Sequence, residues 1–138
     1  MIPNEYRYAS RHFDQFIGLV VEISGLSTPN QAYTMVQGVF QTFRRRLSLE
    51  QAIAFAGVLL FVLSALFIAD WDTAEPRAAF GDRADMTLEV QALRKHHNFS
   101  PDTAIGDVAA ALRRCADQVK LDRVLARSPS GAVAFWRV

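Results

Sequence analysis

The sequence of 138 residues contains only one cysteine and five prolines. Its charges are almost balanced, with 15 Lys plus Arg against 14 Asp plus Glu. Because Cys115 has no partner within the chain, a disulfide-stabilised fold is excluded. A net charge of +1 argues against a dedicated nucleic-acid-binding protein, which concentrates far more lysine and arginine. With 51% hydrophobic residues, the chain is too apolar for disorder and suits one domain with its own core.

Targeting and catalytic motifs are also absent. The sequence contains no Walker loop, no G-x-G-x-x-G, no G-x-S-x-G and no H-E-x-x-H. The acidic residues between Trp71 and Asp85 do not follow the alternate spacing of a calcium-binding loop. We therefore predict no cofactor, no metal ion and no catalytic residue, so that an enzyme is the least favoured class. Residues 1–11 lack the apolar run and cleavage site of a signal peptide, and a cytoplasmic protein is expected.

Two groups of reactive side chains have simple structural explanations. His96 and His97 are adjacent, so on a helix they point about 100° apart and cannot readily share one metal ion. At the end of a predicted helix, they suit the negative end of its dipole. Cys115 lies on an apolar helical stripe, where a thiol behaves as a small hydrophobic group. None of the three is predicted to carry chemistry.

Signals for helix boundaries occur along the whole chain, whereas no stretch shows the period-two alternation of a strand. Apolar spacing predicts helices over 11–24, 29–46 and 49–69, a fourth from Met86, a fifth between Ser100-Pro101 and Cys115, and short turns within 121–138. The boundary residues are Ser10, Gly25, Thr28 with Pro29, Ser48 with Gln51, and Asp85. The sequence predicts an all-α single domain over 1–138, with about six helices and a polar connector at 71–85.

Residues 52–69 form an uninterrupted apolar run, AIAFAGVLLFVLSALFIA, in which Ser64 is the only hydrogen-bonding side chain. These 18 residues reach the lower limit for crossing a membrane. Arginines precede the run and acidic residues follow it, so a small membrane-associated protein with one span at 52–69 is the alternative interpretation. The capping box at Ser48 favours burial in protein instead. We predict a central helix over about 49–69 whose second face is covered by another copy of the chain.

The two halves of the sequence match each other at a spacing of 72 residues. This spacing relates Thr28-Pro29 to Ser100-Pro101, Ala32 to Ala104, Val36 to Val108, Leu49 to Leu121 and Glu50 to Asp122. Internal duplication explains these matches economically, and chance similarity between amphipathic helices is the alternative. We predict two related three-helix halves, about 11–72 and 86–136, packed as one bundle.

A series of mostly apolar residues between Arg11 and Trp136 follows a known family pattern. The series consists of Phe13, Phe16, Val20, Arg46-Leu47-Ser48, Glu50, Ala52, Phe55, Ala56, Leu59, Leu63, Leu66, Phe67, Trp71-Asp72, Leu125-Ala126, Pro129 and Trp136. It resembles the bacterial family called Domain of Unknown Function 2267, whose motifs include F-x-x-F-x-x-x-V and R-L-S followed by L-A-x-Q-L-P and W-[DN]. The resemblance implies a soluble α-helical protein and brings no activity, cofactor or catalytic residue.

The chain departs from that family pattern inside the apolar run. Where the family carries Gln, Pro and Arg, this sequence has Val58, Leu60 and Ser64. Because proline ends a helix, its replacement predicts that the family's helix break is lost and that one helix continues through 52–69.

The strongest charge cluster is Arg44-Arg45-Arg46, at the predicted end of the second helix. Such a cluster neutralises the negative helix end, and contact with phosphates or an anionic membrane surface is the functional alternative. The candidate interaction surface combines it with apolar and aromatic residues: Arg44, Arg45, Arg46, Val58, Phe61, Val62, Trp71 and Trp136. We predict a non-enzymatic protein that acts through self-association as a homodimer, or by binding another protein, and that binds no nucleic acid.

Overall fold

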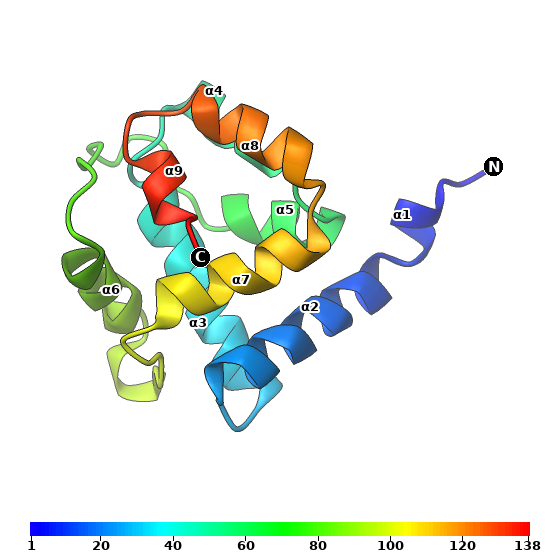
Figure 1. Cartoon of the computed structure of the whole chain (residues 1–138), viewed down its shortest axis with the longest axis horizontal. Helices are drawn as coiled ribbons and strands as arrows, with labels where there is room; N and C mark the ends of the chain where they lie inside the picture. Colours follow the sequence, from blue (N-terminus) through cyan, green and yellow to red (C-terminus); the bar gives the residue numbers. More distant parts are fainter.

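The computed structural model describes residues 1–138, and all of its regular structure is helical (Figure 1). The elements are α1 (Asn4–Arg7), α2 (Ala9–Ser24), α3 (Pro29–Arg44), α4 (Leu49–Ala56), α5 (Phe61–Ile68), α6 (Arg83–Ala92), the 3-10 turn η1 (Lys95–His97), α7 (Ala104–Cys115), α8 (Gln118–Ala126) and α9 (Ala132–Phe135). The prediction of an all-α protein is confirmed. Nine α-helices replace the six expected, because the apolar run is divided and both ends of the chain form short helices.

Helix α3 is the central element of the bundle. Ten of its sixteen residues are buried, and it packs against α2, α5, α6 and α7. Its start is held by a capping box in which Thr28 and Gln31 exchange hydrogen bonds, with Pro29 in the first turn. The prediction that 49–69 forms the central helix is wrong, because helices from both halves of the sequence surround α3 instead.

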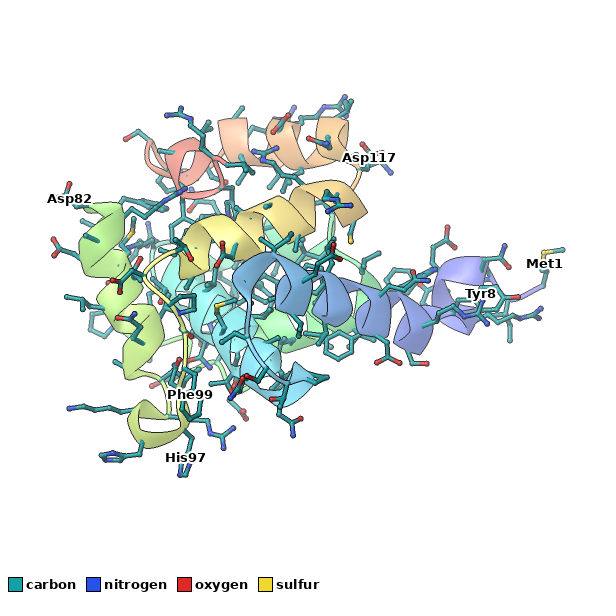
Figure 2. The ribbon with its side chains drawn as sticks, turned by 60° about the horizontal axis from the view of Figure 1, so that its bottom comes forward. Met1, Tyr8, Asp82, His97, Phe99 and Asp117 are labelled. Atoms are coloured by element: carbon teal, nitrogen blue, oxygen red, sulfur yellow. The ribbon has the colours of Figure 1, made fainter.

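Helices far apart in the sequence pack in two main pairs. α2 lies against α7 and α3 lies against α6, while α3 also contacts α7 (Figure 1). The α3–α6 crossing is close, since a Cβ atom at Gly38 would lie 2.8 Å from the carbonyl oxygen of Val90. Any larger residue there would push the two helices apart. Figure 2 shows that α1 and the first turns of α2 project beyond the rest of the bundle.

The core is aromatic where α3, α4, α5 and α9 meet. Phe43 on α3 contacts the rings of Phe55, Phe67, Phe135 and Trp136, with ring centroids 4.8 to 6.5 Å apart. All five side chains are almost completely buried. Because aromatic pairs at these distances add to the stabilisation from buried area, the cluster fixes the short helix α9 to the centre of the bundle.

The apolar run folds back on itself. α4 ends before Gly57, and Leu60 has φ −55° and ψ 147°, an extended conformation that proline also adopts. The prediction of one continuous helix is therefore wrong, and the break is present without the family's proline. Tertiary packing explains it: Phe55 and Phe67 would lie about 18 Å apart along a straight helix, but their ring centroids are 4.9 Å apart across the break.

No helix in this structure is both long enough and apolar enough to span a membrane. α4 and α5 have eight residues each, whereas a span needs about 20. The alternative of one membrane span at 52–69 is therefore wrong.

The predicted helix boundaries at Gly25 and Ser48 are confirmed. Gly25 ends α2 in the left-handed conformation, with φ 75°. Ser48 and Gln51 exchange the two hydrogen bonds of a capping box at the start of α4. α3 ends at Arg44, two residues earlier than predicted, so that Arg45 and Arg46 lie in the turn toward α4.

Three other predicted helix starts are shifted. α2 begins at Ala9, so Ser10 lies inside the helix, and α6 begins at Arg83, before the predicted cap Asp85. Ser100 does not cap α7, which begins at residue 104. Its hydroxyl is instead hydrogen-bonded to the side chain of Asn98, which provides a local partner that the spacing alone could not reveal.

Candidate functional site

The turn after α3 and the connector that leads to α6 are joined by one backbone hydrogen bond and by an arginine side chain. The amide of Ala78 donates to the carbonyl oxygen of Arg45 at 3.0 Å. The Arg46 side chain reaches the same segment, and its Nε donates to the carbonyl oxygen of Ala79 at 3.0 Å. These contacts hold the connector beside the α3–α4 turn, so that two backbone segments face each other across a hollow.

Arg46 is a structural cross-link. Its buried guanidinium pairs with both carboxylate oxygens of Glu89 on α6 and donates to the carbonyl oxygen of Thr42 at 2.7 Å. Arg45 donates to Glu75 at 3.2 Å and shares Glu89 at 3.3 Å. Two arginines and two carboxylates therefore form a neutral network that ties α3 to the connector and to α6.

Arg44 is buried without a carboxylate. Its side chain is 4% exposed, and Nη1 donates to the carbonyl oxygens of Phe67 at 2.9 Å and Ala69 at 3.0 Å. The guanidinium carbon lies 5.3 Å from the ring centre of Trp71, and Nε has no hydrogen-bond partner. Burial lowers the pKa of Arg44 below its usual value, only partly offset by the more distant Glu75. No carboxylate is bonded to Arg44, so carbonyl dipoles and an aromatic face are its direct partners, while Glu75 and Asp70 attract its charge from farther away.

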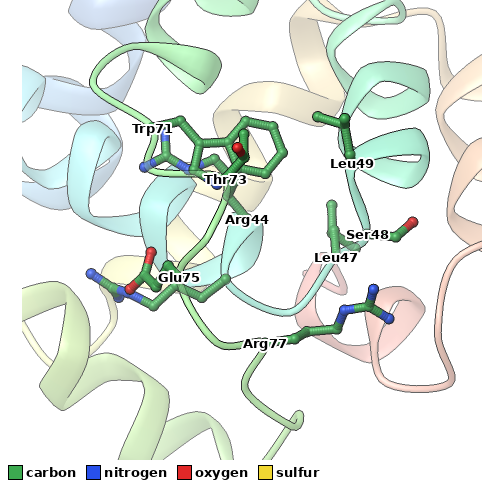
Figure 3. A pocket seen from close by; sticks show the side chains of 9 residues that line it. Arg44, Leu47, Ser48, Leu49, Trp71, Thr73, Glu75 and Arg77 are labelled. Carbon is green, nitrogen blue, oxygen red and sulfur yellow. The ribbon is translucent and has the colours of Figure 1, made fainter.

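A cavity of about 200 Å³ lies beside Arg44, between residues 44–49 and residues 71–77. We call it the arginine pocket. Three arginines and one glutamate line it: Arg44, Arg45, Arg77 and Glu75. Figure 3 shows Arg77 extending from the connector toward Ser48, while Glu75 points to the opposite side. Arg77 is exposed and has no ion-pair partner, so the pocket has an excess of positive charge.

The residues of the predicted interaction surface lie in four separate places. Arg44, Arg45 and Trp71 meet at the arginine pocket. Arg46 points away from the pocket to Glu89, and Trp136 is 0% exposed within the aromatic core. The remaining three residues lie at the α4–α5 break and on α5, where Phe61 is exposed and Val58 and Val62 are half-buried.

Sequence reasoning missed Arg77 and Thr73, which complete the pocket. Both lie in the connector, and no helical spacing relates them to the end of α3. Their position depends on the hydrogen bond between Ala78 and Arg45, which is a tertiary contact. The only signal in the sequence was indirect: a tryptophan followed by charged residues in a segment otherwise suited to a loop.

The histidines and the cysteine lie away from the arginine pocket. His96 and His97 are exposed in η1, and Figure 2 shows His97 at the edge of the molecule. Cys115 is half-buried at the end of α7, and this burial raises the pKa of its thiol, with Arg114 opposing the shift. No three His, Cys, Asp or Glu side chains of the structure group closely enough to hold a metal ion.

The fold and the pocket define a small all-α protein with a cavity that three arginines line. A family described as "Uncharacterized conserved protein (DUF2267)" matches residues 13–135, so the chain belongs to this family. The resemblance stated for its sequence motifs is thereby confirmed. No curated protein matches the chain.

Proposed function

We propose that this protein is a non-enzymatic binding protein that self-associates through the outer face of α5. Ser64 is the only polar residue of this helix, and its hydroxyl is already bonded to the carbonyl oxygen of Ala56. Phe61, Ala65 and Ile68 are nevertheless exposed, Phe61 by 39% and Ile68 by 49%. This exposed apolar face is the observation that carries the proposal.

A second copy of the chain suits this face better than a charged partner does. Residues 61, 65 and 68 lie on one side of the helix, with the small Ala65 between two large side chains. If two α5 helices cross in opposite directions at Ala65, each Phe61 lies opposite Ile68 of the other copy, as two-fold symmetry requires. The face carries no charge, so like charges do not oppose this pairing.

Neighbouring helices would enlarge the interface. A stable dimer buries about 800 Å² on each partner, more than the exposed side of an eight-residue helix provides. The ring of Tyr6 on α1 lies 4.2 Å from the ring of Phe61, and Tyr6 is itself exposed. Ile53 on α4, which packs against α5, is also exposed. The interface therefore includes α1 and α4 beside α5.

The test is the molar mass in solution, measured by light scattering on the purified chain without detergent. The wild type is expected at twice the mass of one chain. Ala65→Glu is expected to be monomeric and folded, because the new charges would meet at the two-fold axis while the side chain of one copy stays in water. Leu88→Glu is the matched control, since Leu88 is an exposed apolar residue on α6.

Two results would contradict self-association. If the wild type is a monomer at every accessible concentration, self-association is wrong and the α5 face would bind another protein. A dimer that Ala65→Glu leaves intact would show that copies meet elsewhere. Circular dichroism on both variants confirms that any change in mass is not a loss of helix.

The finer architecture that we propose is a pair of related halves in one bundle, with residues 11–72 corresponding to 86–136. The reciprocal packing supports this: α2 packs against α7, and the corresponding pair under a 72-residue shift, α6 and α3, also packs together. Val36 and Val108 are equivalent positions and both are completely buried. Ala32 and Ala104 behave in the same way.

The differences between the halves are concentrated at their helix starts and ends. Thr28 caps its helix whereas Ser100 does not, and Leu49 is exposed whereas Leu121 is buried. An experimental structure tests the proposal through superposition. One rotation should bring α2 and α3 onto α6 and α7 at the 72-residue spacing, and a need for separate rotations would refute duplication.

A further inference from the structure

We propose that the arginine pocket binds the phosphate group of a small ligand. The pocket is a concave, mostly polar cavity between the α3–α4 turn and the connector, separate from the α5 face. Its volume of about 200 Å³ is below that of a typical drug-sized site, which limits the buried part of the ligand to a small group.

The charge of the pocket matches a doubly negative group. Arg44, Arg45 and Arg77 contribute three positive charges, and Glu75 contributes one negative charge. Arg45 and Glu75 pair with each other, so that Arg44 and Arg77 are left without a carboxylate. A phosphate monoester carries a charge of about −1.5 to −2 at neutral pH, whereas a carboxylate carries only one. A phosphate monoester therefore balances Arg44 and Arg77 more closely than a carboxylate does.

Arg44 is the buried cation that lines the pocket, and no carboxylate is bonded to it. A buried guanidinium without a counter-ion is unfavourable unless other groups compensate for its lost hydration. Nη1 of Arg44 has two carbonyl acceptors, but Nε is enclosed with no acceptor at all. Trp71 covers the guanidinium and lowers the local dielectric, which strengthens the attraction for an anion beside it.

Further donors surround the same space. Leu49 lines the pocket and begins α4, whose first backbone N–H groups have no acceptor within the helix. Thr73 contributes a hydroxyl from the connector, and Ser48 contributes a hydroxyl whose oxygen accepts from Gln51, which leaves its proton free to donate. Hydroxyls, amides and guanidinium groups together are the donors that proteins use for phosphate.

The experiment is a titration of ¹⁵N-labelled protein at constant ionic strength, followed by amide and indole shifts. Inorganic phosphate is expected to shift the Leu49 amide and the Trp71 indole saturably, with a Kd in the millimolar range or below. The buried Trp136 indole serves as an internal reference. Arg77→Gln is expected to weaken binding about tenfold, because it removes one charge-assisted contact. Arg114→Gln, a change at another exposed arginine without an ion pair, should leave the affinity unchanged.

Two parallel titrations identify the source of the phosphate group. Tighter binding of O-phosphoserine than of inorganic phosphate would assign the site to phosphate carried by a larger molecule, and the reverse would assign it to the free ion. Acetate should bind at least tenfold more weakly than either. Equal binding of acetate, or equal shifts in wild type and Arg77→Gln, would overturn the proposal. Ala65→Glu should bind phosphate normally, so that this proposal and self-association can fail separately.

Discussion

Arg44 ends α3 and Arg46 lies two residues later in the turn, and both are about 95% buried, yet their surroundings differ. Arg46 meets both oxygens of Glu89 and two backbone carbonyl groups. Arg44 meets two carbonyl groups and the face of Trp71, without a carboxylate. The charge of Arg46 is therefore neutralised by Glu89, while Arg44 lines a pocket with an excess of positive charge.

This difference separates structural arginines from candidate ligand-binding ones. A buried cation with its own carboxylate has a complete set of partners and stabilises the contact between helices. A buried cation held by neutral groups keeps its attraction for an anion. The three residues Arg44, Arg45 and Arg46 are identical in type, but Arg46 pairs with Glu89 whereas Arg44 and Arg45 line the arginine pocket.

The largest effect is expected from Glu89→Ala, which removes the carboxylate on the Arg46 side. The change leaves Arg46 buried without a counter-ion, and we expect the free energy of unfolding to fall by about 3 kcal/mol in urea denaturation. Asp122→Ala is the control, because Asp122 pairs with Arg113 at 2.9 Å but is largely exposed. That variant should lose less than about 1 kcal/mol. Equal losses in the two variants would contradict a special role for the buried pair.

Arg44→Met tests the other side of the comparison and should have a smaller effect on stability. Methionine retains much of the apolar stem, and no carboxylate is left unpaired. The carbonyl oxygens of Phe67 and Ala69 lose a donor, so we expect unfolding free energy to fall by about 1–2 kcal/mol. A loss as large as that of Glu89→Ala would mean that Arg44 is also a structural cross-link.

Ser48→Ala and Thr28→Ala form a matched pair that separates capping from ligand binding. Both residues accept a hydrogen bond from the amide three residues later, in the same type of capping box. Each variant should lose about 1 kcal/mol of unfolding free energy. Only Ser48→Ala should also weaken phosphate binding, since Thr28 lies outside the arginine pocket. Identical phosphate affinities in the two variants would limit Ser48 to capping.

Arg77→Gln should change stability least, because its side chain is exposed and has no ion-pair partner. Without phosphate, we expect its unfolding free energy to stay within about 0.5 kcal/mol of wild type. Added phosphate should raise the Tm of the wild type in proportion to binding, and should raise that of the variant much less. A large loss of stability without phosphate would assign Arg77 to the fold instead of the pocket.

The sequence was most informative where a boundary depends on a few neighbouring residues. Thr28 with Pro29 and Ser48 with Gln51 begin their helices as predicted, because both hydroxyls accept from an orphan amide within one turn, and Gly25 adopts a conformation that other residues avoid. The same reasoning failed at Ser100, because Asn98 offers its hydroxyl another partner. Capping residues predict a helix start only when no closer polar group competes for them.

The candidate site was predictable only in part. The three adjacent arginines and Trp71 were identified from composition and order, and three of these four residues line the arginine pocket. Their meeting with Thr73 and Arg77 was not predictable, because it depends on the connector pairing with Arg45 through one backbone hydrogen bond. A backbone hydrogen bond between two loops requires no particular side chains, so no spacing pattern in the sequence predicts it.

The amino-acid sequence by itself determined that the chain is helical, where several helices begin and that it belongs to its family, since these depend on local spacing and on recognisable motifs. Tertiary structure decided that the run 52–69 breaks, which places Phe55 against Phe67, and that α3 occupies the centre. It also decided that Arg46 meets a carboxylate while Arg44 does not. The reason is that burial and charge pairing depend on residues distant in the sequence, whose proximity arises only when the helices pack.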